Sequence, residues 1–345
     1  MKVKLSNNLL VAVLQAVLAV CRGISLKEKL SNYLLVAVLQ AMLAVCRGIK
    51  MIVNYKMILQ YDGTRYNGWQ KQGNTKNTIQ GKIEEILSKY FGQEIELHGS
   101  GRTDAGVHAV GQVANFKVEY QKASIDKIYG AENNIGADKE TGRLKDNAVE
   151  KIKDELNSFL PEDIRILTLE QADNRFHARL NAVEKEYRYY ISLDRKRDVF
   201  ARKYMAQLEH PEKLEIEKMR SASEKFIGEH DFQGFSDNRS KKSTIRRIDS
   251  IEFRLCSENI DNADNYTEKA YNGNVSAVQD GCLEIIFRGN GFLYHTVRLI
   301  VGTLLAVGMG EASADVVDEI FESRDRKRVP YMAPAEGLFL YRVEY

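Results

Sequence analysis

The sequence predicts an α+β protein in which two α/β halves share a largely antiparallel central sheet, flanked by helices, with the active-site cleft between the halves. Two sets of strand-like segments follow one another at spacings typical of hairpins rather than of crossovers. Helices with one apolar face accompany the strands in both halves. A late helix, residues 292–308, is apolar on most faces, so we expect it to be buried.

The first half begins with an apolar strand that runs into the turn signal Asp62-Gly63. Its main helix is predicted by apolar residues at helical spacing, such as Ile79, Ile83 and Leu87. The expected strands are 57–61, 94–98 and a third running through 116, and the expected helices are 78–90 and 151–159.

The second half repeats this pattern with more strands. A helix is expected before Gly228, which ends it, and the buried late helix follows the last hairpin. The expected strands are 165–170, 176–179, 185–193, 244–255 and 283–288, and the helices are 214–227 and 292–308.

Composition divides the chain into three parts. Residues 1–50 are a tandem-repeat extension that we expect to lie outside the fold. The first half covers 51–156 and the second half 157–345. Two polar stretches without hydrophobic periodicity, about 123–146 and about 257–280, are interpreted as inserts, one in each half.

Charge and cysteine usage describe an ordinary soluble protein. Apolar residues make up 44% and charged residues 28% of the 345 positions, and the formal net charge is only +2. Such a small net charge does not by itself indicate nucleic-acid binding, so local clusters matter more. The four cysteines and six histidines show no metal-ligand or disulfide spacing, which favours reduced thiols in the cytoplasm and predicts no structural metal. Basic residues gather in 185–203, 239–247 and 324–328.

The most informative segment is Gly-Arg-Thr-Asp-Ala-Gly-Val-His-Ala, residues 101–109. It places one carboxylate, Asp104, between an arginine and glycines, after one strand-like run and before another. Glycines at 99, 101, 106 and 111 permit positive φ and close approach of another chain segment. An aspartate in such a turn is usually a cap, and only its neighbours suggest more.

These nine residues resemble, letter for letter, the signature of the TruA family of tRNA pseudouridine synthases. The resemblance extends over nearly all of residues 55–345 apart from the two inserts, although Thr296 stands where the family usually has methionine. The other matching blocks are 61–64 with 68–70, 176–179, 228–232, 291–298 with 301–303, and 333–338.

The resemblance implies that Asp104 is the catalytic nucleophile. Pseudouridine formation detaches uracil from C1′ of the ribose and rejoins it through C5. A carboxylate can serve either as the covalent nucleophile at C1′ or as the base that assists glycal formation. The sequence does not choose between these two mechanisms.

Three further residues complete the predicted site. Arg298 lies on the apolar late helix, where an unpaired guanidinium is costly, and the resemblance implies that Asp104 is its partner. Tyr187 shares one strand face with Tyr189, and the resemblance implies that Tyr187 lies against the target base, where it stacks or helps with proton removal. Arg102 is implied to stabilise a flipped-out nucleotide. Thr103 and His108 are interpreted as structural hydrogen-bonding residues, and Tyr189 and Tyr190 as core aromatics.

The resemblance further implies a cytoplasmic, cofactor-free enzyme that isomerises uridine at positions 38, 39 and 40 of the tRNA anticodon stem-loop. It also implies a homodimer, for which the late helix and terminal strand are expected to supply the interface. Basic residues would contact RNA phosphates across a broad face. The candidates are 195–197, 202–203, 241–242 and 246–247.

Three alternatives remain. A catalytically silent RNA-binding paralogue would not need Asp104, Tyr187 and Arg298 together. A glycoside hydrolase normally pairs two acids across the scissile bond, whereas the motif of Asp104 holds no second acid. A pseudouridine synthase for other RNA sites fits the same sequence.

The first fifty residues pose a separate question. Residues 5–24 recur with few changes as 30–49, and two copies are fewer than a self-stabilising repeat array needs. The apolar run 9–20 is shorter than the about 20 residues that span a bilayer. With Cys21 it resembles a lipoprotein signal, but Val20 is bulky for that cleavage site.

We interpret this extension as lying upstream of a working protein that begins near Met51 or Met57, because the family resemblance starts only at residue 55. If the repeats are translated, they are expected to form apolar helices, and their membrane association stays open. N-terminal sequencing of native protein that finds Met1 followed by both repeats would contradict this hypothesis.

Overall fold

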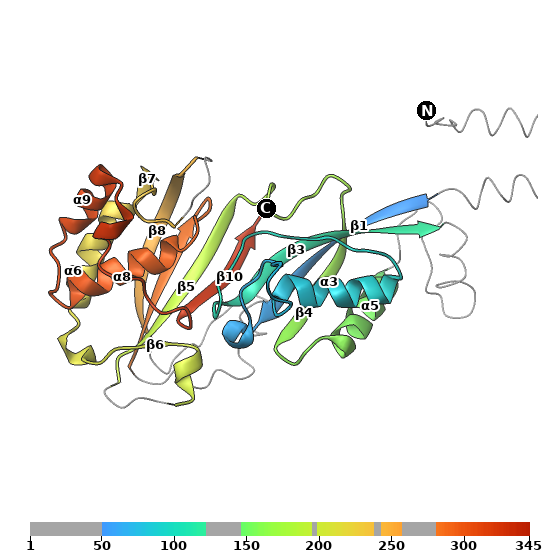
Figure 1. Cartoon of the computed structure of the whole chain (residues 1–345), viewed down its shortest axis with the longest axis horizontal. Coiled ribbons are helices and arrows are strands. Elements are labelled where there is room, and N and C mark those ends of the chain that lie inside the picture. The colour runs from blue at the N-terminus through green and yellow to red at the C-terminus, as the bar shows by residue number, and fades with distance from the viewer. Residues whose placement is uncertain (1–49, 122–145, 195–198, 238–242, 257–280) are drawn as a thin grey trace, which may run out of the picture. The chain divides into compact units, whose positions relative to one another are not determined.

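The computed structural model describes residues 50–121, 146–194, 199–237, 243–256 and 281–345 (Figure 1). Nearly all of the predicted N-terminal extension and of both predicted inserts lies outside these described residues. So do two of the candidate basic segments, 195–197 and 241–242.

In the described part of the chain, ten strands form one sheet in which most neighbours are antiparallel. The order is β4-β1-β3-β10-β5-β9-β8-β7, with β2 paired to β3 and β6 paired to β5. This mixed sheet with separate helices confirms the predicted α+β class. The strands are β1 (Lys50–Tyr61), β2 (Leu97–Gly99), β3 (His108–Gln121), β4 (Ile164–Ala172), β5 (Glu184–Ser192), β6 (Ala206–Gln207), β7 (Gly228–Asp231), β8 (Ile245–Cys256), β9 (Cys282–Gly289) and β10 (Leu338–Glu344).

The helices pack on the sheet in two groups (Figure 1). One group, α3 and α5, lies at the strands β4, β1 and β3, and the other, α6, α8 and α9, lies toward β9 and β8. The helices are α3 (Ile79–Phe91), α5 (Asp146–Phe159), α6 (Ile216–Ser223), α8 (Thr296–Gly308) and α9 (Val316–Ser323). Short 3-10 turns cover Gly63–Arg65, Ala201–Lys203, Pro211–Lys213, Glu224–Phe226 and Arg326–Arg328.

The ends of α3 follow from the sequence. Thr78 caps the helix, because its side-chain oxygen accepts a hydrogen bond from the backbone N–H of Gly81 at 3.2 Å. Gly92 ends the helix in the left-handed region, with φ of 63°. The apolar residues used for the prediction, such as Ile79, Ile83 and Leu87, are buried.

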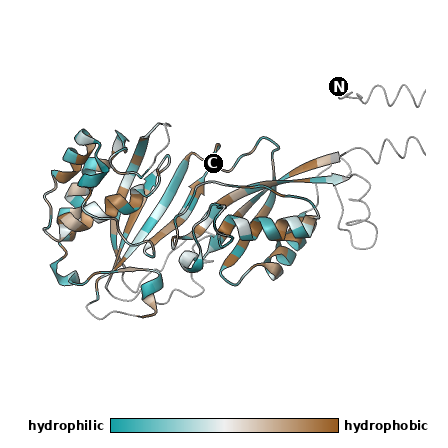
Figure 2. Cartoon of the chain, in the orientation of Figure 1, coloured by the Kyte–Doolittle hydropathy of each residue, from teal (hydrophilic) through white to brown (hydrophobic). Residues whose placement is uncertain are grey.

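The late helix is buried on every side, as predicted. All residues of α8 are buried, and Figure 2 shows hydrophobic residues concentrated on α8 and on the strands beside it. Arg298 is its one charged residue. Thr296 is also buried, and its hydroxyl has no hydrogen-bond partner among the described residues.

This burial narrows one prediction. The late helix and the terminal strand were expected to supply a subunit interface. The α8 residues are covered by their own chain, and residues 338–341 of β10 are buried between β3 and β5. Tyr294, which lies before α8 within the predicted late helix, and Tyr345, which follows β10, are exposed, so the interface stays a prediction.

Residues 176–179 were predicted to form a strand, and this is also wrong: they lie in a series of turns. The backbone N–H of Arg175 donates to the Asp173 carboxylate at 2.7 Å, and the N–H of His177 donates to Asn181 Oδ1 at 2.8 Å. Such local side-chain acceptors satisfy the backbone and compete with pairing in a sheet.

Strand β10 joins the two halves of the sheet, because it lies between β3 and β5. It pairs in parallel with the start of β3, where Phe339 faces His108, and antiparallel with β5, where Leu340 faces Tyr187. β3, which begins at the end of the signature motif, and β5, which carries Tyr187, therefore pair with the two edges of β10.

Candidate active site

The signature motif forms a tightly bonded loop between β2 and β3. The N–H of Ser100 donates to Val113 O at 2.7 Å, and Gln112 Nε2 donates to Gly101 O at 2.9 Å. The N–H of Trp69 donates to Thr103 O at 3.0 Å. Because buried backbone groups are costly when unpaired, these bonds fix the path of the loop.

Asp104 opens a β-turn within this loop. The N–H of Val107 donates to Asp104 O at 3.2 Å, and Gly106, at the third position of the turn, has φ of 80°. A type II turn requires positive φ there, so glycine is needed. At Gly99 and Gly111, by contrast, the glycine allows close approach: a Cβ atom would lie 2.6 Å from the Trp69 ring and 2.3 Å from Tyr341 O, respectively.

The structure brings Asp104 and Arg298 together. Arg298 Nη1 donates to Asp104 Oδ2 at 3.3 Å, and both side chains are nearly buried, with exposures of 13% for Asp104 and 11% for Arg298. The guanidinium also donates from Nε to Ala333 O at 2.8 Å, so it offers Asp104 one nitrogen and not a two-pronged fork. Burial raises the pKa of Asp104, and the charges of His295 and Arg298 oppose that rise.

A histidine that the sequence analysis left unassigned completes the contacts of the carboxylate. His295 Nε2 lies 3.6 Å from Asp104 Oδ2, and Nδ1 lies 2.7 Å from Asp237 Oδ2. Asp237 in turn lies 3.2 Å from Arg326 Nε. An imidazole between two carboxylates can hold positive charge beside Asp104 and orient it. The sequence signal was its position directly before α8, three residues from Arg298.

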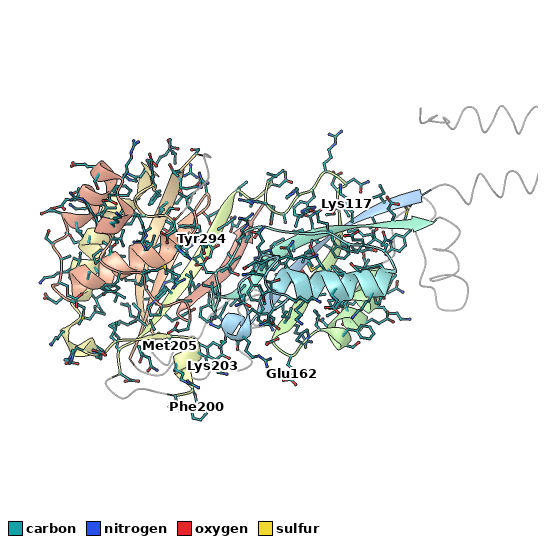
Figure 3. All side chains as sticks on the ribbon, in the orientation of Figure 1. Lys117, Glu162, Phe200, Lys203, Met205 and Tyr294 are labelled. Atoms are coloured by element: carbon teal, nitrogen blue, oxygen red, sulfur yellow. The ribbon has the colours of Figure 1, made fainter. Side chains whose placement is uncertain are left out.

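His295 also has an unusual backbone, with φ of 66° at the N-cap of α8. Its ring stacks on the neighbouring Tyr294, which is labelled in Figure 3, with 3.6 Å between ring centroids. A non-glycine residue in the left-handed region is uncommon, and asparagine is among the residues that tolerate it best. The conformation aims the imidazole at Asp104.

We predict that His295→Asn lowers the single-turnover rate of the chemical step by about tenfold, equivalent to about 1.4 kcal/mol. Asparagine keeps the left-handed backbone and a donor for Asp237 but cannot hold a positive charge beside Asp104. Rapid-quench measurement gives the rate, and thermal unfolding should show little change. An unchanged rate would contradict this role for His295.

Tyr187 lies against the same loop. A Cβ atom at Gly101 would lie 3.6 Å from the Tyr187 hydroxyl, and the side chain is only 7% exposed. The edge of its ring packs against Phe292 with centroids 5.2 Å apart. Burial raises the pKa of the Tyr187 hydroxyl, with smaller contributions from Tyr61 and Asp104, so the phenol stays protonated at neutral pH.

The remaining motif residues have distinct surroundings. Arg102 is exposed, and partial burial together with the charge of Arg179 lowers its pKa. The Thr103 hydroxyl bonds to the Tyr61 hydroxyl at 2.8 Å. His108 Nδ1 accepts from the N–H of Gly63 at 3.1 Å, so Thr103 and His108 both hold the scaffold.

Tyr189 and Tyr190 are buried, and each hydroxyl bonds within the core. Tyr189 donates to Pro334 O at 2.8 Å and Tyr190 donates to Glu284 at 2.9 Å. The structure therefore separates Tyr187, beside the motif loop, from two tyrosines that serve the packing of β5.

The described residues offer neither a metal site nor a membrane span. No group of three or more His, Cys, Asp and Glu side chains in the described ranges is arranged to hold a metal ion. None of the helices described there combines the length and continuous apolar sequence that a bilayer span requires.

Comparison with known proteins defines the class. A family model described as tRNA pseudouridine synthase matches residues 57–181 and 222–345, which together cover more than half of the chain. The two matched segments include the whole signature motif, the late helix and β10. The chain belongs to the tRNA pseudouridine synthase family and is an isomerase of that family.

Curated relatives are similar over most of their length. The chain is 41% identical over 296 residues to tRNA pseudouridine synthase A from Bacillus sp. (strain KSM-64), covering 85% of this chain and 99% of that protein. It is 38% identical over 293 residues to tRNA pseudouridine synthase A 2 from Bacillus anthracis, with the same coverage. It is 37% identical over 297 residues to tRNA pseudouridine synthase A from Listeria monocytogenes serotype 4b, covering 85% of this chain and all of that protein.

Proposed function

We propose that the protein converts uridine to pseudouridine in tRNA at positions 38, 39 and 40 of the anticodon stem-loop, with Asp104 as the catalytic carboxylate. The observation that carries the proposal is the nearly buried Asp104 in its bonded loop, 3.3 Å from Arg298 and in electrostatic contact with Tyr187. The family match and the names of the relatives support tRNA as the substrate.

The chemistry follows from this arrangement. The bond from N1 of uracil to C1′ breaks, the base turns, C5 bonds to C1′, and the proton on C5 is lost while N1 gains one. Asp104 attacks C1′ or removes the proton that yields a glycal, and both routes need it ionised. Burial raises the pKa of Asp104, and the charges of His295 and Arg298 act against that rise and so favour the ionised form.

The target base has to leave the RNA stack to reach Asp104. Tyr187 and Phe292 offer aromatic surface beside the motif loop, and Arg102 stands exposed at the position before Thr103. We propose that Tyr187 stacks on the extruded uracil and that Arg102 stabilises the flipped-out nucleotide.

Two basic residues, Arg202 and Lys203, also lie near the motif loop. Arg202 and Lys203 line a cavity of about 410 Å³ together with Thr64, Gly106 and Glu336. Figure 3 labels Lys203 and its neighbour Met205 in this part of the molecule. We propose that these two cations contact RNA phosphates.

The experiment that tests the function is incubation of the full chain with undermodified tRNA, followed by mapping of pseudouridine at single-nucleotide resolution. Product at positions 38 to 40 supports the proposal. Product only at other sites would favour a synthase of different specificity, and no product in any RNA would favour a silent RNA-binding protein.

We further propose that the protein works as a cytoplasmic homodimer. In the segments predicted for the interface, Tyr294 before α8 and Tyr345 after β10 are the exposed aromatic residues that a second subunit could contact. Size-exclusion chromatography with light scattering should give twice the monomer mass of 39.3 kDa. A mass equal to the monomer would overturn the dimer.

We predict that Tyr187→Phe keeps the single-turnover rate within about tenfold of wild type, whereas Tyr187→Ala loses more than about a hundredfold. The hydroxyl stays protonated in the site, so the ring carries the effect. Loss of a general base would cost about a hundredfold or more. A phenylalanine variant as slow as the alanine variant would show that the hydroxyl takes part in the chemistry.

A further inference from the structure

Four cations border the site and are here called the four-cation cluster: Arg102, which we have proposed to stabilise the flipped-out nucleotide, together with Arg179, Lys185 and Arg246. They act on one another electrostatically. The charge of Arg179 lowers the pKa of Arg102, Lys185 and Arg246, and the charge of Arg246 also lowers that of Lys185. The four residues come from separate segments, which the fold brings together.

Lys185 is the innermost member. It precedes Tyr187 by two residues on β5, so the two side chains share one face of the sheet. Its Nζ donates to Ser100 O at 2.7 Å, and a Cβ atom at Gly101 would lie 3.4 Å from Nζ and 3.6 Å from the Tyr187 hydroxyl. The ammonium and the phenol therefore flank the same point of the motif loop.

Arg246 also lies near the site. A Cβ atom at Gly291 would lie 3.9 Å from Arg246 Nε, and the next residue, Phe292, packs against the Tyr187 ring. Lys185 and Arg246 thus both lie near the aromatic pair that we propose for the extruded base.

Among the described residues, no carboxylate pairs with Arg102, Lys185 or Arg246. In the described residues, the charges that shift Arg102, Lys185 and Arg246 are all positive, and no carboxylate contributes. Arg188, another partly buried cation on β5, is paired with two carboxylates: it lies 2.7 Å from Glu186 and 3.0 Å from Glu284. Gathering like charges costs free energy, which a bound anion offsets.

We propose that the four-cation cluster binds one backbone phosphate of the RNA, next to the nucleotide whose base lies at Asp104. The inference rests on the proposed function, because that function brings a polyanion to this point. Every nucleotide in an RNA chain carries a phosphate on either side of its ribose. A ribose with C1′ at Asp104 places one of them within reach of cations that flank Tyr187.

The test is a phosphate scan on an anticodon stem-loop RNA. Each RNA carries one uncharged methylphosphonate linkage with a 2′-deoxy sugar at that step, and the matching 2′-deoxy RNA with normal phosphate is its control. Dissociation constants are measured for the full-length wild type, Lys185→Gln, Lys185→Arg and the exposed control Lys89→Gln, which lies on α3. Thermal unfolding checks that each variant is folded.

We expect Lys185→Gln to weaken binding about tenfold and to reduce the slope of log affinity against log salt by about one. One flanking methylphosphonate should weaken wild type to a similar extent and weaken Lys185→Gln no further. Lys185→Arg should bind like wild type, and Lys89→Gln should show neither effect. If the losses from Lys185→Gln and from every flanking methylphosphonate simply multiply, the phosphate contact is wrong.

A pH measurement gives a second readout. Burial, followed by the charges of Arg179 and Arg246, lowers the pKa of Lys185 to about 8, so above that pH the free protein holds it largely neutral. A phosphate brought beside it favours the charged form, so binding at pH 8.5 should take up a proton. Calorimetry in buffers of different ionisation enthalpy should detect this uptake in wild type and much less in Lys185→Arg.

Asp104, His295 and Tyr187 also lie at the site, and Lys185→Arg leaves all three in place. Equal proton uptake in wild type and Lys185→Arg would therefore overturn the assignment of the proton to Lys185. Failure of the proposed function is a separate result: wild type would then form no pseudouridine in the unmodified RNA, whatever the phosphate scan shows.

Discussion

Replacing Asp104 by asparagine is expected to lower the rate of pseudouridine formation by at least about a thousandfold, the order seen when a nucleophile is removed from an enzyme. Asparagine has the same shape but can neither attack C1′ nor take a proton from the ribose. RNA affinity should stay within a few-fold of wild type, because Asp104 makes no contribution to binding a polyanion. Rapid-quench kinetics and a separate binding measurement distinguish the two effects.

The control for this experiment is Asp154→Asn, an exposed carboxylate on α5 far along the chain from the motif. It should leave the rate unchanged. Mass spectrometry has to show that the introduced asparagine has not deamidated back to aspartate during preparation. Turnover near the wild-type rate by intact Asp104→Asn would overturn the assignment of the catalytic carboxylate.

Arg298→Lys is expected to lower the rate of the chemical step by about a hundredfold or more while RNA affinity changes little. The guanidinium serves Asp104 through Nη1 and Ala333 O through Nε, two contacts that one ammonium cannot make in the same geometry. Removing a partner from a nearly buried ion pair commonly costs about 3–5 kcal/mol, and a lysine that reaches Asp104 poorly forfeits part of that. Single-turnover kinetics measure the loss.

Thermal unfolding separates catalysis from stability in this variant. The contact from Arg298 to Ala333 ties α8 to the segment before β10, so Arg298→Lys is also expected to unfold at a lower temperature. Arg298→Met, which removes the charge but fills a similar volume, should be slower than Arg298→Lys. Wild-type activity in Arg298→Lys would show that neither geometry nor the planar donors matter.

Much of the fold could be predicted from local patterns. The α+β class followed from the alternation of strands and amphipathic helices, and α8 followed from a run of apolar residues long enough for a helix and apolar all round. Thr78 and Gly92 marked the ends of α3 with the chemistry that caps require. These features depend on residues close together in sequence, which is why a sequence pattern reveals them.

The errors arose where side chains or distant segments decide the structure. Residues 176–179 looked like a strand, but Asp173 and Asn181 satisfy the nearby backbone and turn the chain. The place of β10 was not predicted either, because nothing in the sequence says that the terminal strand enters between β3 and β5. The roles given to Asp104, Arg298, Tyr187 and Arg102 stay predictions.

Only some of the residues at the candidate site could be identified from the sequence. Arg298 was informative because a cation on an apolar helix needs a partner, and the structure places it 3.3 Å from Asp104. His295 and Lys185 were not identified, because a lone histidine and a lysine at the start of a strand are common on ordinary surfaces. Their positions depend on a left-handed residue at the start of α8 and on the register of β5, neither of which periodicity predicts.

The central place of β10 has a consequence for how an active molecule arises. Every other strand of the sheet precedes β10 in the chain, so the ribosome makes it after all of them. A nascent chain that stops short of Leu338 already carries Asp104 and Tyr187 but lacks β10. Without β10, β3 and β5 are not held in register, and the backbone groups of these two strands that pair with β10 have no partner there. We therefore expect chains that end before β10 to be inactive and prone to aggregate.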